Sequence, residues 1–259
     1  MTPIIAVINQ KGGIGKSTTA LALAAGLKRN GFRVLSVDLD PQGNMTYAMA
    51  ADPAGPTSLD MMLNGTDALL VIQQGDQGDI IPASTDLIRS NTLLNLPTRE
   101  YRLRESLKPI RKAYDYIVID TPPALNILTI NAMTAATGLV IPTQADIFSI
   151  HGIGQLYDTI QATRNHSNPD LAIIGILMTR HNPRTILSRD LEKTMRDIAK
   201  KLDTKIFKTT IRECIALREA QILQKDIFTY SPRSNAAKDY AALVGEITKG
   251  AKHAKETKV

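Results

Sequence analysis

Two patterns alternate along the chain: short apolar runs, and longer segments with apolar residues at helical spacing. Residues 3–8 have the composition of a buried parallel strand, and residues 17–28 then repeat apolar positions at helical spacing. Similar apolar runs predict further strands at residues 33–38, 79–83, 138–142, 171–177 and 205–207. Strands that alternate with helices predict an α/β fold with a single doubly wound, mostly parallel sheet and helices on both faces.

The segments between these runs predict the helices and the extent of the domain. Helical composition is found at residues 58–63, 100–114, 146–164, 184–202 and 234–249. Because no linker or internal repeat interrupts the alternation, residues 1–249 are predicted to form one domain. Residues 250–259 are rich in lysine and poor in apolar side chains, and we expect them to fray.

A glycine-rich loop lies between the first predicted strand and the first predicted helix. It consists of Gln10, Lys11, Gly12, Gly13, Ile14, Gly15, Lys16, Ser17 and Thr18. Glycines let successive backbone N–H groups converge on an anion, and the helix N-terminus adds a partial positive charge. In such a loop Lys16 reaches the β- and γ-phosphates and the Ser17 hydroxyl reaches Mg²⁺. The loop therefore predicts nucleotide binding.

One position departs from the usual phosphate-loop pattern, Gly-x-x-x-x-Gly-Lys-Ser/Thr. Gln10 stands where the first glycine is expected, and Lys11 follows it. A second lysine at the mouth of the loop can point at solvent, at the bound nucleotide or at the nucleotide of another protomer. A solvated surface lysine is the simplest alternative, because charged side chains are usually exposed.

Three aspartates follow predicted strands and supply the expected chemistry. Asp38 and Asp40 follow the second strand, and Asp120 ends a strand at residues 116–120. Ligands bind at the carboxyl ends of strands in open α/β sheets, so these carboxylates can face the bound phosphates. We expect Ser17, with Asp120 or Asp38 acting through water, to hold Mg²⁺, and Asp40 to orient or deprotonate the attacking water. The alternative for Asp40 is a turn residue before proline.

Composition limits the remaining classes of function. Cys214 is the single cysteine, which excludes an internal disulfide framework and a Cys-x-x-Cys metal site within one chain, and fits a reducing cytoplasm. No apolar stretch has the length of a signal peptide or of a membrane span, so we expect a soluble, cytoplasmic protein.

The net charge of +6 is unevenly distributed. Residues 1–179 carry 13 basic and 15 acidic side chains (net −2), whereas residues 180–259 carry 18 and 10 (net +8). A basic C-terminal third suggests a polyanion partner, most simply nucleic acid. The alternative is a solvated basic surface.

Taken together, these motifs resemble the ParA/MinD class of P-loop ATPases, which carry a deviant Walker A box. The matching segments are residues 11–18, 37–44, 117–123, 128–132, 141–144 and 236–240. The resemblance covers nearly the whole chain and is closest to ParA-type partition ATPases without an N-terminal DNA-reading domain. It implies a P-loop NTPase fold with ATP and Mg²⁺ as cofactors.

The resemblance also implies roles and partners. Lys11 would reach the phosphates of a partner subunit in a nucleotide-sandwich homodimer, Lys16 would bind ATP, Gly12 would permit close dimer approach and Asp40 would serve hydrolysis. The ATP-bound dimer would bind DNA non-specifically and lie on the nucleoid, and a ParB-like, centromere-bound adaptor would stimulate hydrolysis. Candidate DNA-binding residues are Arg180, Arg184, Arg189, Lys200, Lys201, Arg212, Arg218 and Arg233.

Other branches of the class fit this chain less well. Iron–sulfur members need paired cysteines, and MinD-type members end in an amphipathic membrane helix with bulky apolar residues, which residues 250–258 lack. The first strand begins almost at Met1, so we expect no N-terminal operator-binding domain. Where many members have Ile-Pro-Arg beside the adenine, this chain has residues 210–214 without proline, so the base contacts are expected to differ.

Two further functions remain open from the sequence. One is a positioning or scaffold ATPase that docks a conjugation or polar protein complex without binding DNA. The other is a metabolic P-loop ligase or kinase that releases a small-molecule product.

Overall fold

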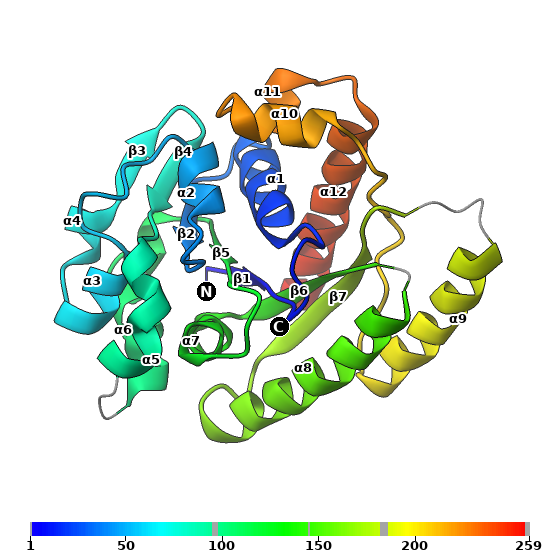
Figure 1. Ribbon diagram of the computed structural model, residues 1–259, viewed down its shortest axis with the longest axis horizontal. Coiled ribbons are helices and arrows are strands. Elements are labelled where there is room, and N and C mark those ends of the chain that lie inside the picture. The colour runs from blue at the N-terminus through cyan, green and yellow to red at the C-terminus, as the bar shows by residue number, and fades with distance from the viewer. Residues whose placement is uncertain (1, 95–97, 145, 182–185, 257–259) are drawn as a thin grey trace.

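A seven-stranded sheet forms the centre of the molecule (Figure 1). The computed structural model describes residues 2–94, 98–144, 146–181 and 186–256, and within them the strand order is β3-β4-β2-β5-β1-β6-β7. The strands are β1 (Ile4–Val7), β2 (Val34–Asp38), β3 (Gln73–Gly75), β4 (Gly78–Ile81), β5 (Tyr116–Asp120), β6 (Gly138–Thr143) and β7 (Ala172–Met178).

The strand pairing confirms the predicted doubly wound sheet. Every neighbouring pair is parallel except β3 and β4, which form an antiparallel hairpin at one edge. The chain winds from β1 toward one edge through β2 and β4, and later toward the other through β6 and β7. The carboxyl ends of β1, β2 and β5 consequently lie side by side at the point where the winding reverses, which is where open α/β sheets bind ligands.

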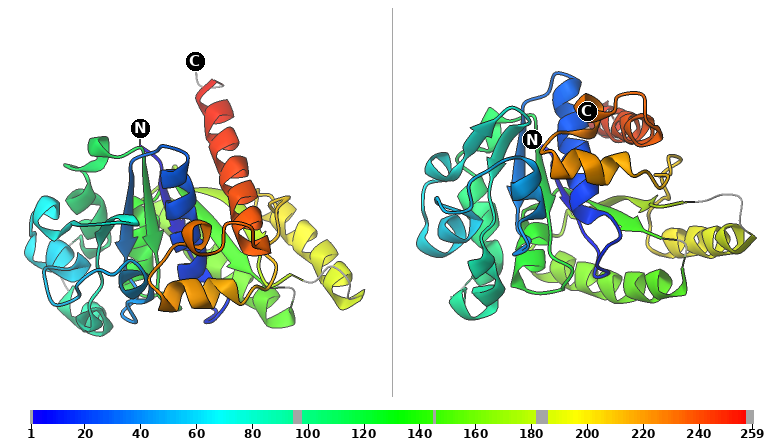
Figure 2. Two further views of the ribbon diagram at one scale, coloured as in Figure 1. Left: turned by 90° about the horizontal axis from the view of Figure 1, so that it is seen from above. Right: turned by 45° about the horizontal axis from the view of Figure 1, so that its top comes forward.

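Helices cover both faces of the sheet (Figures 1 and 2). The α-helices are α1 (Lys16–Arg29), α2 (Asn44–Ala48), α3 (Ser58–Asn64), α4 (Ala68–Val71), α5 (Ser90–Leu93), α6 (Arg102–Leu107), α7 (Ile127–Ala135), α8 (Ile147–His166), α9 (Ile186–Lys201), α10 (Ala216–Ile222), α11 (Ile227–Tyr230) and α12 (Asn235–Glu256). Short 3₁₀ helices are η1 (Thr85–Arg89), η2 (Arg99–Tyr101) and η3 (Arg111–Ala113).

Alternate residues of the central strands face two separate apolar cores. In β1, Ile4 and Ala6 face the core formed with α3, α6, α7, α8 and α9. Ile5 and Val7 face the core formed with α1, α10, α11 and α12. Because side chains alternate along a strand, a continuous apolar run supplies both faces at once, as a doubly covered parallel sheet requires.

Helix α1, which begins at the phosphate loop, packs closely on α12 because residue 26 is glycine. A Cβ atom on Gly26 would lie 2.7 Å from Val244 Cγ2, a distance that real contacts do not reach. The hydroxyls of Thr19 and Tyr240 pair between the same two helices at 3.1 Å. The C-terminal helix is thereby fixed beside the helix that would carry the phosphates.

Some element boundaries differ from the sequence-based prediction. The helix predicted over residues 100–114 is divided into η2, α6 and η3. Helix α6 ends at Leu107 with Lys108 as its C-cap, because the next residue, Pro109, has no backbone N–H to continue the helical hydrogen bonds. The β3–β4 hairpin includes a strand that was not predicted, since Gln73–Gly75 has no apolar run that would mark one.

Near the C-terminus the differences are smaller. Residues 205–207 contribute only an isolated bridge between Ile206 and Ile176 instead of a full strand. Helix α12 continues to Glu256, beyond the predicted end at Lys249. Fraying of the tail stays a prediction, and its last residues, 257–259, lie outside the described residues.

Candidate nucleotide-binding site

The loop between β1 and α1 forms an open cradle. Gly13 and Gly15 have φ angles of +73° and +91°, which non-glycine residues rarely adopt, and Gly15 directly precedes the first turn of α1. No heavy atom outside the neighbouring residues lies within 4 Å of a Cβ built on Gly12, Gly13 or Gly15. The N-terminus of α1 carries no acidic side chain in its first turn. This open, positively polarised space suits a phosphate group.

The Lys16 side chain curls over this loop. Its Nζ donates to the backbone carbonyl of Lys11 at 3.0 Å, and the residue is buried. Burial lowers the Lys16 pKa, and the negative charges of Asp120 and Asp40 act in the opposite direction. The ammonium is therefore held in a desolvated position with a single neutral acceptor, which an incoming phosphate would replace with a stronger, charged one.

Asp38 and Asp120 lie directly opposite each other at the ends of the paired strands β2 and β5. Asp38 Oδ1 accepts from the N–H of Asp40 at 3.0 Å. Its Oδ2 accepts from the N–H and the hydroxyl of Thr46, both at 2.8 Å. Burial raises the pKa of Asp38 to about 6 despite these bonds. The Asp38 carboxylate therefore connects the loop that contains Asp40 with the first turn of α2.

Asp120 has an unpaired oxygen in the interior. Its Oδ1 accepts from the N–H of Thr121 at 3.0 Å, whereas Oδ2 is buried and has no hydrogen-bond partner among the residues that the structure describes. Burial raises the Asp120 pKa well above its usual value, Asp38 raises it further, and the neighbouring Ser17 hydroxyl opposes the shift. A buried carboxylate oxygen without a donor, next to a serine hydroxyl, is an oxygen ligand set that fits Mg²⁺.

Asp40 lies close enough to Lys16 for their charges to interact, and only 5% of the residue is exposed. Its Oδ1 accepts from the N–H of Gln42 at 3.0 Å, which makes the turn that an Asp-Pro sequence favours. Burial raises the Asp40 pKa, and the Lys16 ammonium opposes this. The turn role and the catalytic role are thus compatible, because no residue in the described part of the chain bonds to the second oxygen, which is left to a ligand or water.

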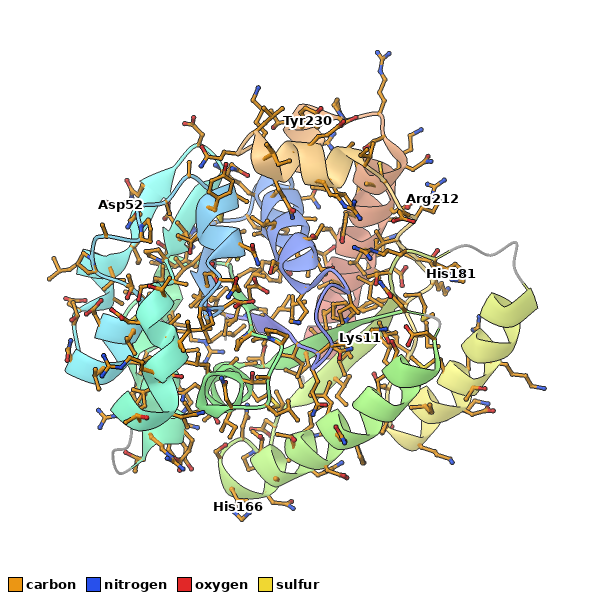
Figure 3. All side chains as sticks on the ribbon, viewed as in Figure 1. Lys11, Asp52, His166, His181, Arg212 and Tyr230 are labelled. Carbon is orange, nitrogen blue, oxygen red and sulfur yellow. The ribbon has the colours of Figure 1, made fainter. Side chains whose placement is uncertain are left out.

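Lys11 points away from its own phosphate cradle. Its Nζ forms an ion pair with Asp146 Oδ2 at 2.7 Å, and 35% of the lysine side chain is exposed. Lys11 is labelled in Figure 3, between the phosphate loop and the start of α8. Asp146 also caps α8, since it accepts from the N–H and the hydroxyl of Ser149, both at 2.9 Å. The backbone of Lys11 is fixed by Asn9 Oδ1 at 3.0 Å.

A cavity of about 270 Å³ opens beside the phosphate loop. Its inner wall includes Ile14, Gly15 and Thr18 from the loop and α1, Thr179 after β7, Cys214, and Gln221 on α10. The Thr179 hydroxyl donates to the carbonyl of Ile14 at 2.9 Å, which joins the loop to the end of β7. A nucleoside attached to phosphates in the cradle would enter this cavity.

Three of the predicted DNA-binding residues line this same cavity: Arg180, Arg212 and Arg218. The Arg212 guanidinium donates two hydrogen bonds to Asp239 on α12, at 3.0 and 2.6 Å, and the backbone N–H of Arg212 donates a third at 3.1 Å. The side-chain hydrogen bond to Asp239 raises the Arg212 pKa. Arg218 lies 4.0 Å from the Glu213 carboxylate. The positions of these arginines therefore suit contact with a nucleotide in the cavity at least as well as contact with DNA.

The other basic candidates lie elsewhere. Lys200 and Lys201 are exposed at the end of α9, on the opposite face of the sheet from α10 and α12 (Figure 1). Arg233 is exposed just before α12. Arg189 belongs to α9, and Arg184 lies outside the described residues. The described candidates are thus divided between two faces of the molecule.

Sequence reasoning missed Asn9, Thr46, Asp146 and Gln221. Asp146 and Gln221 have partners far along the chain: Lys11 and Asp146 are 135 residues apart, and Thr18 and Gln221 are 203 apart. Asn9 and Thr46 also bond to Lys11 and Asp38, two and eight residues away. None of them belongs to a motif with a fixed spacing.

Within the described residues, the structure has no helix that is long and apolar enough to cross a membrane.

Comparison with known proteins gives a family and several relatives. A family model described as AAA domain matches residues 2–173. The sporulation initiation inhibitor protein Soj of Bacillus subtilis is 39% identical over 253 residues, which are 95% of this chain and 98% of the relative. The chromosome-partitioning ATPase Soj of Thermus thermophilus is 38% identical over 244 residues, 94% of each chain.

Solved structures of similar fold include a protein that was solved with two different bound nucleotides. Cobyrinic acid a,c-diamide synthase from Mycobacterium smegmatis, with bound ADP and magnesium, has a TM-score of 0.84 and 32% identity, covering 97% of this chain and 96% of that one. The same protein with a bound ATP analog and magnesium also has a TM-score of 0.84, with 30% identity and the same coverage.

Proposed function

This chain belongs to the AAA domain family and, within it, to the ParA/MinD class of P-loop ATPases, and on that premise we propose that it is an ATPase for DNA partition. Its relatives include a chromosome-partitioning ATPase that it matches over almost its full length. The observation that carries the ATPase part of the proposal is the buried, unpaired oxygen of Asp120 beside an open phosphate cradle, with Lys16 over the loop and Lys11 at its mouth. The match to the chromosome-partitioning relative supports the role in DNA partition.

In the proposed ATPase, the residues of the loop hold the nucleotide. The N–H groups of residues 12–17 bind phosphate oxygens, and Lys16 exchanges the Lys11 carbonyl for the β- and γ-phosphates. Ser17 and the free oxygen of Asp120 hold Mg²⁺, which neutralises phosphate charge when bound. Dependence of hydrolysis on Mg²⁺ is part of the proposal.

The two aspartates of the second acidic motif have different tasks in this scheme. Asp40 orients or deprotonates the attacking water through the oxygen that its turn leaves free. Asp38 was expected among the metal ligands, but both of its oxygens already accept hydrogen bonds from the loop. We assign it to positioning Asp40, with any contact to the metal made through water.

Lys11 connects the site to a second subunit in this proposal. It lies at the mouth of the loop, is one-third exposed and bonds to Asp146 rather than to its own cradle. In an ATP-bound homodimer it would leave Asp146 and reach the phosphates of the partner. Gly12, whose Cβ position is open, would allow the two loops to approach closely.

DNA and an adaptor complete the proposed cycle. The basic C-terminal third supports non-specific binding to phosphates by the ATP-bound dimer, with the exposed Lys200, Lys201 and Arg233 as candidates that lie outside the cavity. A ParB-like, centromere-bound adaptor would stimulate hydrolysis and release the dimer from the nucleoid.

The proposal is tested by measuring DNA binding of the purified protein with ATP, ADP or no nucleotide at several salt concentrations. We expect tight binding only with ATP, with an affinity that falls steeply as salt rises. Binding that ignores both nucleotide and salt would contradict a nucleotide-controlled DNA switch.

A metabolic P-loop ligase is a second candidate, because the M. smegmatis protein named as a synthase is 32% identical over nearly the whole chain. A ligase would couple ATP hydrolysis to a small-molecule product. Steady hydrolysis with DNA and an adaptor alone, in the absence of any small-molecule acceptor, would argue against it. A scaffold ATPase would keep its cellular position when Lys200 and Lys201 are changed to alanine, whereas a DNA-bound protein would become diffuse.

A further inference from the structure

The side chain of Gln221 lies between the phosphate loop and the adjoining cavity. Gln221 is partly buried on α10 and lines the cavity together with Thr18. Its Nε2 donates a hydrogen bond to Thr18 Oγ1 at a distance of 3.0 Å. Because Thr18 directly follows Ser17 in α1, this bond holds the carboxamide where the base of a loop-bound nucleotide would begin.

This bond determines which end of the amide a ligand meets. A primary amide has a donor end and an acceptor end, so the use of Nε2 by Thr18 leaves Oε1 as the group available to a ligand. Among the described residues, Oε1 has no hydrogen-bond partner. The cavity thus has a fixed, neutral acceptor in its inner wall.

Two other polar groups in the cavity wall, Arg212 and the Tyr240 hydroxyl, are already engaged. Arg212 is paired with Asp239, and the Tyr240 hydroxyl is paired with Thr19. Neither pair needs a ligand to satisfy it, and Arg212 is anchored to α12 at the outer side. Gln221 is therefore an oriented, neutral group in this wall that can distinguish one base from another.

We propose that Gln221 is a specificity-determining residue whose Oε1 accepts a hydrogen bond from the 6-amino group of adenine. The inference deepens the proposed function, because it rests on a nucleotide occupying the cavity. A carboxamide recognises the same amino group of adenine in nucleic acids. A base with a keto oxygen at that position would place two acceptors against each other and be rejected.

The test compares ATP with purine riboside triphosphate, which lacks the 6-amino group, and with inosine triphosphate, which has a keto oxygen there. Equilibrium binding to the wild-type protein should be roughly three- to tenfold tighter for ATP than for purine riboside triphosphate, the value of one neutral hydrogen bond. Inosine triphosphate should bind more weakly still. In Gln221→Leu the ratio between ATP and purine riboside triphosphate should fall to about one.

Gln224→Leu is the matched control. It makes the same change just beyond the end of α10, but Gln224 bonds to the carbonyl of Tyr47 and does not line the cavity. The ATP preference should persist in this variant. Gln221→Glu keeps an acceptor toward the cavity and should also retain the ratio, even if the added charge weakens both triphosphates.

Thr18→Val removes the hydroxyl that orients the amide. The freed carboxamide can turn its donor to the ligand, so discrimination against inosine triphosphate should decrease. Equal weakening of ATP and purine riboside triphosphate by Gln221→Leu, or a wild-type preference for inosine triphosphate, would overturn the assignment of Gln221 alone. Failure of the wild-type protein to bind ATP at all would instead contradict the proposed ATPase.

Discussion

The two ends of the candidate site differ in how their polar groups are satisfied. At the phosphate end, Lys16, Asp38, Asp40 and Asp120 are buried close together, and Asp120 keeps an unpaired oxygen. At the base end, Arg212 is half-exposed, and its guanidinium donates two hydrogen bonds to Asp239. The phosphate end is thus electrostatically strained without ligand, whereas the base end is nearly satisfied.

This difference separates affinity from selectivity. Buried charges without full partners cost free energy, and a phosphate with its metal ion relieves that cost on binding. A neutral, oriented hydrogen-bonding group adds little affinity but rejects a ligand that cannot match it. We therefore expect changes at the phosphate end to alter binding and hydrolysis strongly, and changes at the base end to alter ratios between nucleotides.

The largest expected effect is on hydrolysis by Asp40→Asn. The variant keeps the turn, because its amide oxygen can still accept from Gln42, but it loses the charge that would activate water. We expect the hydrolysis rate to fall by about 10²–10⁴-fold, the usual value of a general base, with ATP still bound. Steady-state phosphate release together with nucleotide binding checks this. Equal rates in variant and wild type would remove Asp40 from its role.

The next effect is on nucleotide affinity in Lys16→Ala. Loss of one charge-assisted bond to phosphate should weaken ATP binding roughly 10- to 100-fold. Lys28→Ala is the matched control, since Lys28 lies near the other end of α1, is exposed and bonds to the carbonyl of Asp76. If the two variants bind ATP equally well, the phosphate end is not the source of affinity.

Asp120→Asn should stabilise the ligand-free protein by roughly 1–3 kcal/mol at neutral pH, because it removes a buried carboxylate with an unpaired oxygen. It should also abolish the thermal stabilisation that ATP with Mg²⁺ gives the wild type. Thermal unfolding with and without ligand measures both. A variant that is less stable without ligand would show that Asp120 is fully satisfied in the empty site.

The same carboxylates predict a pH dependence. Burial raises the pKa of Asp38 to about 6 and that of Asp120 well above its usual value, so the folded protein holds these protons more tightly than the unfolded chain. The free energy of unfolding of the ligand-free protein should consequently decrease as pH rises from about 4 through about 6. Asp120→Asn should flatten this decrease, which a series of urea titrations across that range would show.

The phosphate end could be predicted from sequence because its residues lie in short contiguous segments. Lys16 and Ser17 follow a glycine loop directly, and Asp38 and Asp120 each end an apolar run. The parallel sheet then places the ends of β2 and β5 in register, so that local patterns determine a three-dimensional cluster. The alternation of strands and helices likewise predicted the doubly wound sheet.

The base end could not be predicted in this way. Its wall combines Thr18, Thr179 and Gln221, which come from three distant segments. Gln221 is brought to Thr18 by the placement of α10, and Thr179 is brought to the phosphate loop by the end of β7. The hydroxyl and amide groups involved are common on any polar helix face, so their spacing carries no signal. The net charge of a segment also does not show on which face of the sheet its basic residues lie, because the fold topology determines that.

The smallest expected effect concerns Asp146, which holds Lys11 at the mouth of the loop. About one-third of each side chain in this ion pair is exposed, so the pair contributes only modestly to holding Lys11 in place. Asp146→Asn keeps an oxygen to cap α8 but removes the charge that retains Lys11, and should increase ATP-dependent dimer formation about two- to fivefold. Ser149→Ala is the control, because it weakens the same cap without changing the charge. Sedimentation with a non-hydrolysed ATP analog measures the dimer, and fewer dimers in Asp146→Asn would mean that Asp146 supports the dimer rather than restraining Lys11.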